Sequence, residues 1–140
     1  MNRMKVSFCL IGDKNSNLFD GAVITDALGI QPTVIRLAKD FPQASIKAGV
    51  AHNYWCFSIE LCDCWGVPQC LMELRNQLSD KISIINSLIM QENLISHIEI
   101  SLHSNLAEMP ELSLSCEDIF FLAQIGADIG IDPYFNEDEQ

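Results

Sequence analysis

The chain has 140 residues, of which 49% are hydrophobic, so it is long enough to form one domain with a sizeable core. Its formal net charge is −11, from 19 Asp and Glu residues against 8 Lys and Arg residues. This charge repels phosphate groups and anionic lipid headgroups, which argues against binding to nucleic acids or membrane surfaces. No apolar run reaches the length of a membrane-spanning helix, and we expect no signal peptide because no cleavage site follows the apolar segment 6–11.

The negative charge is concentrated in the second half of the chain. Residues 82–140 contain eleven acidic residues and no Lys or Arg, whereas residues 1–81 contain eight residues of each sign. An acidic surface of this kind attracts basic proteins. The alternative interpretation is that the charge only keeps the protein in solution.

The hydrophobic pattern of the first 40 residues predicts two strands separated by a short helix. A nearly continuous apolar strand spans 5–11, the helix spans 19–28 and a second strand spans 33–37. Gly29 and Pro32 separate this helix from the second strand. Glycine favours the left-handed conformation that ends many helices, and proline cannot continue one.

The middle of the chain predicts two longer strands with helical sequence between them. Segments 54–61 and 95–103 alternate apolar and polar side chains, so each strand has one polar face. Between them, apolar residues recur at helical spacing over 68–91. This pattern indicates either one long helix or two helices joined near Ser79-Asp80, where a new helix cap is available.

The C-terminal part predicts a short extended piece at 112–114, a helix that begins after Ser115 and a last strand at 127–134. The element order is therefore the ferredoxin-like β-α-β-β-α-β, followed by a C-terminal β-α-β. We expect an α+β fold with an antiparallel or mixed sheet of about five to six strands and helices packed on one face. In this prediction, residues 1–135 form a single domain and residues 136–140 form an acidic disordered tail.

Four short stretches, spread over nearly the whole chain, form a recognisable set when they are taken together. They are Gly12-Asp13; Ile24-Thr25 with Leu28-Gly29-Ile30 and Pro32-Thr33; Gly49 followed by Trp55; and Leu122-Ala123 to Ala127 with Asp132 and Tyr134. This set resembles the bacterial domain-of-unknown-function family 4279. Because that family has no established activity, the resemblance transfers no functional residue to this chain.

Candidate catalytic and metal-binding residues are few. His97 and Glu99 form an H-x-E pair, but no Pro-Cys-x-x-Cys follows to supply the thiolates of a zinc deaminase. Cys62, Cys64 and Cys70 lack the second pair of ligands that structural zinc sites need. We therefore expect no metal, no cofactor and no catalytic residue, and we expect the six cysteines to be reduced in a cytoplasmic protein.

The functional hypothesis is a non-enzymatic acidic domain that binds a basic partner protein. Its most concrete form is an immunity or antitoxin-type inhibitor of a basic bacterial toxin such as a nuclease. The alternative is a small-molecule-binding or regulatory domain with a pocket between the sheet and the loop 39–53. We expect a monomer or weak homodimer. The predicted partner-binding residues lie on the polar strand faces and in the tail: Glu60, His97, Glu99, His103, Glu137, Asp138 and Glu139.

Overall fold

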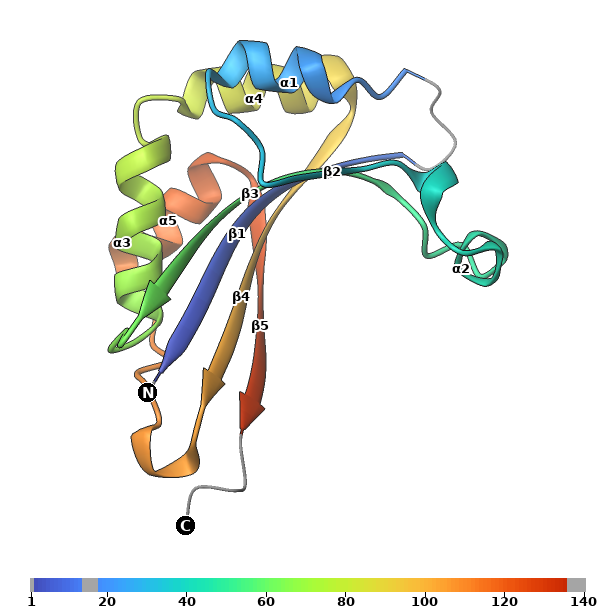
Figure 1. The fold of residues 1–140 in the computed structure, drawn as a ribbon. Coiled ribbons are helices and arrows are strands. Elements are labelled where there is room, and N and C mark those ends of the chain that lie inside the picture. The colour runs from blue at the N-terminus through green and yellow to red at the C-terminus, as the bar shows by residue number, and fades with distance from the viewer. Residues whose placement is uncertain (1, 14–17, 136–140) are drawn as a thin grey trace.

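The computed structural model describes residues 2–13 and 18–135 (Figure 1). In these residues five strands form one sheet with the order β2-β3-β1-β4-β5. The strands are β1 (Arg3–Gly12), β2 (Val34–Arg36), β3 (Asn53–Cys62), β4 (Leu94–Ser104) and β5 (Ala127–Phe135). The helices are α1 (Gly21–Leu28), α2 (Gln43–Lys47), α3 (Val67–Leu78), α4 (Ile82–Glu92) and α5 (Cys116–Gln124), with 3-10 turns η1 (Ala38–Asp40) and η2 (Leu106–Glu108).

The sheet is mixed, and its first strand lies at the centre. β1 pairs antiparallel with both β3 and β4, and β2 extends the sheet antiparallel to β3. β5 pairs parallel with β4, as expected for two strands joined by a crossover helix, here α5. The predicted fold class, α+β with a mixed sheet and helices packed against it, is confirmed.

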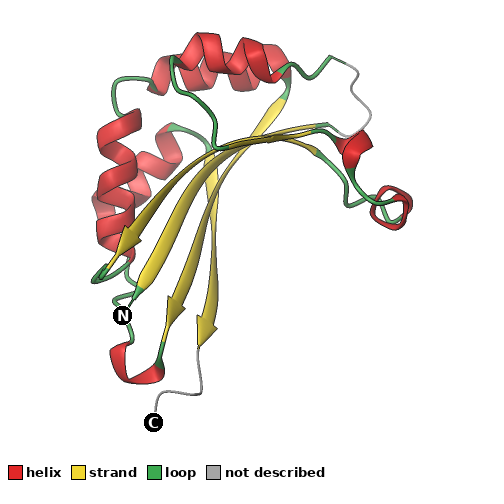
Figure 2. Cartoon of the chain, in the orientation of Figure 1, coloured by secondary structure: helices red, strands yellow, loops and turns green. Residues whose placement is uncertain are grey.

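The sheet bends along its length, and the helices lie on the outer side of the bend. Figure 2 shows the long helices along the outer side of the bend, and the labels of Figure 1 identify them as α1, α3, α4 and α5. The small helix α2 lies at the far end of the sheet, away from these four. The inner, concave side of the sheet is therefore left open within the described residues.

Alternating side chains of the strands build the core between the sheet and the helices. Phe8 of β1 and Trp55 of β3 are fully buried, and their rings meet edge to face with centroids 6.4 Å apart. The Trp55 indole also donates a hydrogen bond to Thr25 Oγ1 at 3.0 Å, which satisfies its polar atom and ties α1 to the sheet. No helix in the described part of the chain is long and apolar enough to cross a lipid bilayer.

Three local predictions need comment. The helical segment 68–91 is two helices, and the N-cap of α4 is Lys81 rather than Ser79 or Asp80. The piece 112–114 is not a strand; only the preceding Glu111 forms an isolated bridge, with Gly66. The segment 39–53, expected to be irregular, contains most of η1 and all of α2.

Candidate functional site

The concave side of the sheet is covered by side chains that alternate with the core residues of four strands. We call this surface the open face. Its residues are Arg3, Lys5, Ser7, Cys9 and Ile11; Tyr54, Cys56, Ser58, Glu60 and Cys62; Ile95, His97, Glu99, Ser101 and His103; and Asp128, Gly130, Asp132 and Tyr134.

The strand register arranges these side chains in rows across the sheet. Cys9 lies opposite Cys56 on one side and opposite His97 on the other, and His97 lies opposite Asp128. The same strands bring Lys5 opposite Glu60 in another row. Residues in a row are direct neighbours on one face, so each row sets its side chains next to one another across the sheet.

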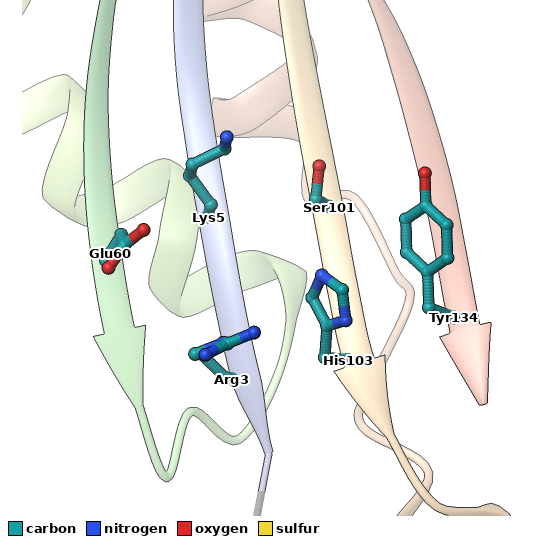
Figure 3. A pocket seen from close by; sticks show the side chains of 6 residues that line it. All are labelled: Arg3, Lys5, Glu60, Ser101, His103 and Tyr134. Carbon is teal, nitrogen blue, oxygen red and sulfur yellow. The ribbon is translucent and has the colours of Figure 1, made fainter. Parts of the chain in front are cut away.

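The first hollow in the open face has a volume of about 360 Å³ and a mixed charged and polar lining. Figure 3 shows its side chains on four adjacent strands, with Arg3 and Lys5 between Glu60 and His103. The rings of His103 and Tyr134 stack with their centroids 4.8 Å apart, which forms one wall of the hollow.

Tyr134 is fixed by its neighbour two positions earlier on the same strand. Its hydroxyl donates a hydrogen bond to Asp132 Oδ2 at 2.7 Å. That bond and the negative charge of Asp132 raise the pKa of the Tyr134 hydroxyl, because both favour its protonated form. Tyr134 is therefore a hydrogen-bonding aromatic side chain rather than a source of phenolate at neutral pH.

The second hollow, of about 460 Å³, lies over the row that contains His97. His97 Nδ1 pairs with Asp128, and its Nε2 lies 2.7 Å from Glu99 Oε2. Burial lowers the pKa of the imidazole, but the bonds to Asp128 and Glu99 outweigh it, so the pKa is raised overall. A protonated imidazole donates from both nitrogens and has no free lone pair, which disfavours His97 as a base or metal ligand.

A glycine makes room for this arrangement. Gly130 lies opposite Glu99, and a Cβ atom at Gly130 would lie only 2.6 Å from Glu99 Oε2. Any larger residue would therefore push the Glu99 carboxylate away from its position beside His97. No group of three or more His, Cys, Asp or Glu residues within 2–13 and 18–135 could hold a metal ion.

The predicted partner-binding residues fall into two groups. Glu60, His97, Glu99 and His103 all lie on the open face. The other three, Glu137, Asp138 and Glu139, lie outside the described residues together with the predicted tail.

The structure adds residues to this surface that sequence reasoning did not select. Arg3 and Lys5 place two cations on the open face, and Asp128 and Asp132 extend it on β5. The alternation of side chains along β5 could have identified the two aspartates. Asp128 and Asp132 lie an even number of positions from Tyr134, so all three side chains point to the same face of the strand. The signal was weaker for β1, whose apolar character hid its alternation.

The cysteines separate into core and surface residues. Cys64 and Cys70 are buried beneath the helices, with sulfur atoms 3.7 Å apart, so the structure places both in the core. Cys62 and Cys116 are exposed. Cys9 and Cys56 form a pair on the open face, with sulfur atoms 2.6 Å apart. Nothing in the sequence pattern indicates that these two cysteines are neighbours.

The two hollows do not lie where the alternative hypothesis expected a pocket. Both are lined by strand residues of the open face, and neither includes a residue of segment 39–53. A ligand in either hollow would lie on the sheet itself.

These features define a class of protein: an α+β domain whose mixed sheet carries helices on one side and an open polar face on the other. The chain belongs to the family described as Domain of unknown function (DUF4279), whose model matches residues 2–136 and thus nearly the whole chain. No curated protein and no solved structure matches the chain.

Proposed function

We propose that this protein is a non-enzymatic binding domain that holds a basic partner protein against its open face. The observation that supports it most strongly is the concave, helix-free side of the sheet, which carries four carboxylates on three strands. They are Glu60, Glu99, Asp128 and Asp132. In its most concrete form the protein is a cytoplasmic immunity or antitoxin-type inhibitor of a basic toxin such as a nuclease, and acts as a monomer or weak homodimer.

Most carboxylates of the open face are held in place by neighbouring side chains, which favours a role in binding. Glu99 and Asp128 are held by His97, and Asp132 is held by Tyr134, so three of the four are fixed before a partner arrives. Fixed side chains lose little conformational entropy on binding, which favours affinity. The net charge of −11 adds long-range attraction for a cationic partner.

Arg3 and Lys5 give the open face a mixed charge pattern rather than a uniform one. Both lie on the central strand, in rows that also contain acidic or aromatic residues. A mixed pattern fixes the orientation of a partner and penalises partners whose charges are arranged differently. The expected partner is therefore basic overall but carries at least one acidic group opposite β1.

The first test is capture of the partner from a lysate of the source organism, with washes at low and at high salt and identification by mass spectrometry. We expect one basic protein in stoichiometric amount, retained less well at high salt because screening weakens exposed charge pairs. Failure to capture any specific protein at either salt concentration would contradict the proposal.

The second test maps the contact. Glu60→Lys with Asp132→Lys changes two exposed carboxylates of the open face and should slow association with the captured partner at least about tenfold at low salt. The matched control is Asp26→Lys with Asp80→Lys, which changes the net charge equally on the helical side. Equal slowing in both variants would show that only total charge matters and would exclude the open face as the contact.

A second candidate function rests on the hollow of about 360 Å³. Its lining combines the cations Arg3 and Lys5 with Ser101, one carboxylate (Glu60) and the His103–Tyr134 stack, a set suited to a small ligand with an anionic group and a flat ring. A thermal-shift screen of such compounds tests it, because a ligand that binds only the folded state raises the melting temperature. A shift that disappears in Arg3→Gln would favour this function over partner binding.

A further inference from the structure

Cys9 and Cys56 lie side by side on neighbouring strands of the open face. They are direct partners in the antiparallel β1–β3 ladder, and their sulfur atoms are 2.6 Å apart. The backbone carbonyl of Cys56 accepts a hydrogen bond from the Thr33 amide at 2.8 Å, so the Cys56 backbone is directed toward β2 and away from β1. Cys9 and Cys56 are therefore a non-hydrogen-bonded pair, the type in which opposite side chains approach most closely.

This geometry suits a covalent bond between the two residues. Non-hydrogen-bonded pairs have Cα atoms about 4.5 Å apart, which lies within the range that disulfides span. The sulfur atoms need to approach by only a fraction of an ångström to reach the bond length of about 2.05 Å. Both residues are free thiols in this structure.

The surroundings give a small molecule access to one sulfur more than to the other. Both cysteines line the hollow of about 460 Å³, together with Lys5 and His97. Cys9 is only 8% exposed, whereas Cys56 is partly exposed. Glu99 and Asp128 balance the charge of His97, whereas Lys5 forms no ion pair among the described contacts, so Lys5 is the group at the hollow that favours an anionic reaction partner.

The two thiols differ in acidity. The contact between the two sulfur atoms lowers the pKa of Cys56 and outweighs the opposing effect of burial, and His97 and Lys5 lower it further. The same contact and burial raise the pKa of Cys9. Cys56 is also the more exposed of the two thiols, so it is the attacking residue and Cys9 is the resolving one, the division of roles found in reactive dithiols.

We propose that Cys9 and Cys56 form a thiol–disulfide exchange site whose substrate is a low-molecular-weight anionic disulfide. The Cys56 thiolate attacks one sulfur of the substrate, breaks its S–S bond and releases one thiolate. Cys9 then gives up its proton and attacks the Cys56 sulfur of the mixed disulfide. The second thiol leaves with this proton, so the protein loses two electrons to form the Cys9–Cys56 bond and the substrate is reduced to two thiols.

The experiment incubates the fully reduced chain with glutathione disulfide, quenches with acid, alkylates the remaining thiols and maps the peptides by mass spectrometry. Cys62→Ser with Cys116→Ser serves as background, because it removes the two exposed cysteines. We expect a peptide linked through Cys9 and Cys56, no retained glutathione at this pair, and full alkylation of Cys64 after denaturation. The buried Cys64–Cys70 pair is the internal control, since its sulfurs are also close but face the core.

Single variants in the same background separate the two steps. Cys9→Ser should retain glutathione on Cys56, because no second thiol is present to displace it. Cys56→Ser should lose modification at the open face. Three results with the Cys62→Ser/Cys116→Ser background protein, in which Cys9 and Cys56 are intact, would overturn the proposal. They are glutathione retained on Cys56, no modification of either cysteine, and a Cys64–Cys70 link instead. The peptide map of this background protein tests the proposal even if Cys9→Ser or Cys56→Ser fails to fold.

Discussion

His97 balances the acidic groups of the open face. Its two ring nitrogens lie against Asp128 and Glu99, so one cation separates two carboxylates that would otherwise repel each other. The imidazole is only partly exposed, with 26% of its side chain accessible, which limits screening by solvent. The protonation state of His97 therefore affects the stability of this part of the sheet.

We expect His97→Gln to flatten the pH dependence of stability. The folded-state pKa of His97 lies above its unfolded value of about 6.5. Its stabilising contribution is therefore complete below about pH 6.5 and is lost as the pH rises through the folded-state pKa. Urea unfolding at a series of pH values should show this fall in the wild-type free energy of unfolding and a smaller fall in the variant.

The matched control for this measurement is His103→Gln, which removes the other histidine of the same strand face. In the wild type, the His103 ring stacks on Tyr134 and forms no ion pair with a carboxylate among the described contacts. The pH dependence in this variant should follow that of the wild type. If the free energy of unfolding depends on pH equally in the wild type and in His97→Gln, then Glu99 and Asp128 do not stabilise the protonated form of His97.

At the level of elements, the end of α1 depends on one backbone conformation. Gly29 has φ +67°, and its amide donates to the Thr25 carbonyl at 2.8 Å. A Cβ atom at this position would meet no neighbour within 4 Å. The requirement for glycine therefore comes from the left-handed backbone and not from crowding.

Gly29→Ala should lower the free energy of unfolding by about 1 kcal/mol, because the Cβ atom of alanine destabilises the left-handed backbone conformation. Gly29→Asn should lower it less, since asparagine tolerates this region better. Urea unfolding of the three proteins measures both effects. Equal losses from the two substitutions would point to steric crowding rather than to backbone conformation.

The sequence predicted this element and others that depend on local pattern. The alternation of 54–61 and 95–103 identified which residues of β3 and β4 face the core, because neighbouring residues on a strand point to opposite sides. The start of α4 was misplaced: Ser79 and Asp80 have favourable capping side chains, yet the helix begins after Lys81 without a side-chain cap. Packing of Ile85 and Leu88 in the core accounts for a helix there despite the weak start.

The rows of the open face could not be predicted in the same way. Cys9 and Cys56 are 47 positions apart, and the pairing of β1 with β3 depends on long-range register that periodicity within one strand does not contain. The same limit applies to His97 and Asp128, which are brought together only by the parallel pairing of β4 and β5. The sequence therefore identified side chains on the open face but not their contacts.

For the molecule as a whole, the negative charge is present on both sides of the sheet. Acidic residues lie on the open face and also on the helical side, for example Asp26 and Asp80. Because 19 acidic residues face 8 Lys and Arg residues, an excess of eleven negative charges remains whichever ion pairs form. Self-repulsion of this kind destabilises a compact state.

We therefore expect moderate salt to stabilise the protein. Raising NaCl from about 10 mM to about 100 mM shortens the screening length from about 30 Å to about 10 Å, which weakens repulsion between separated carboxylates. Urea unfolding at the two concentrations should give a higher free energy of unfolding at the higher salt. A fall instead would mean that attractive ion pairs outweigh the repulsion.

The central position of β1 has a consequence for how the chain folds. Arg3 pairs with His103, 100 residues later, so the middle of the sheet cannot close until β4 has left the ribosome. Until then the first strand has only β3 as a partner and exposes the hydrogen-bonding groups of its other edge. Non-local pairing of this kind slows folding. The nascent chain therefore exposes one unpaired edge of a largely apolar strand until β4 is available late in its synthesis.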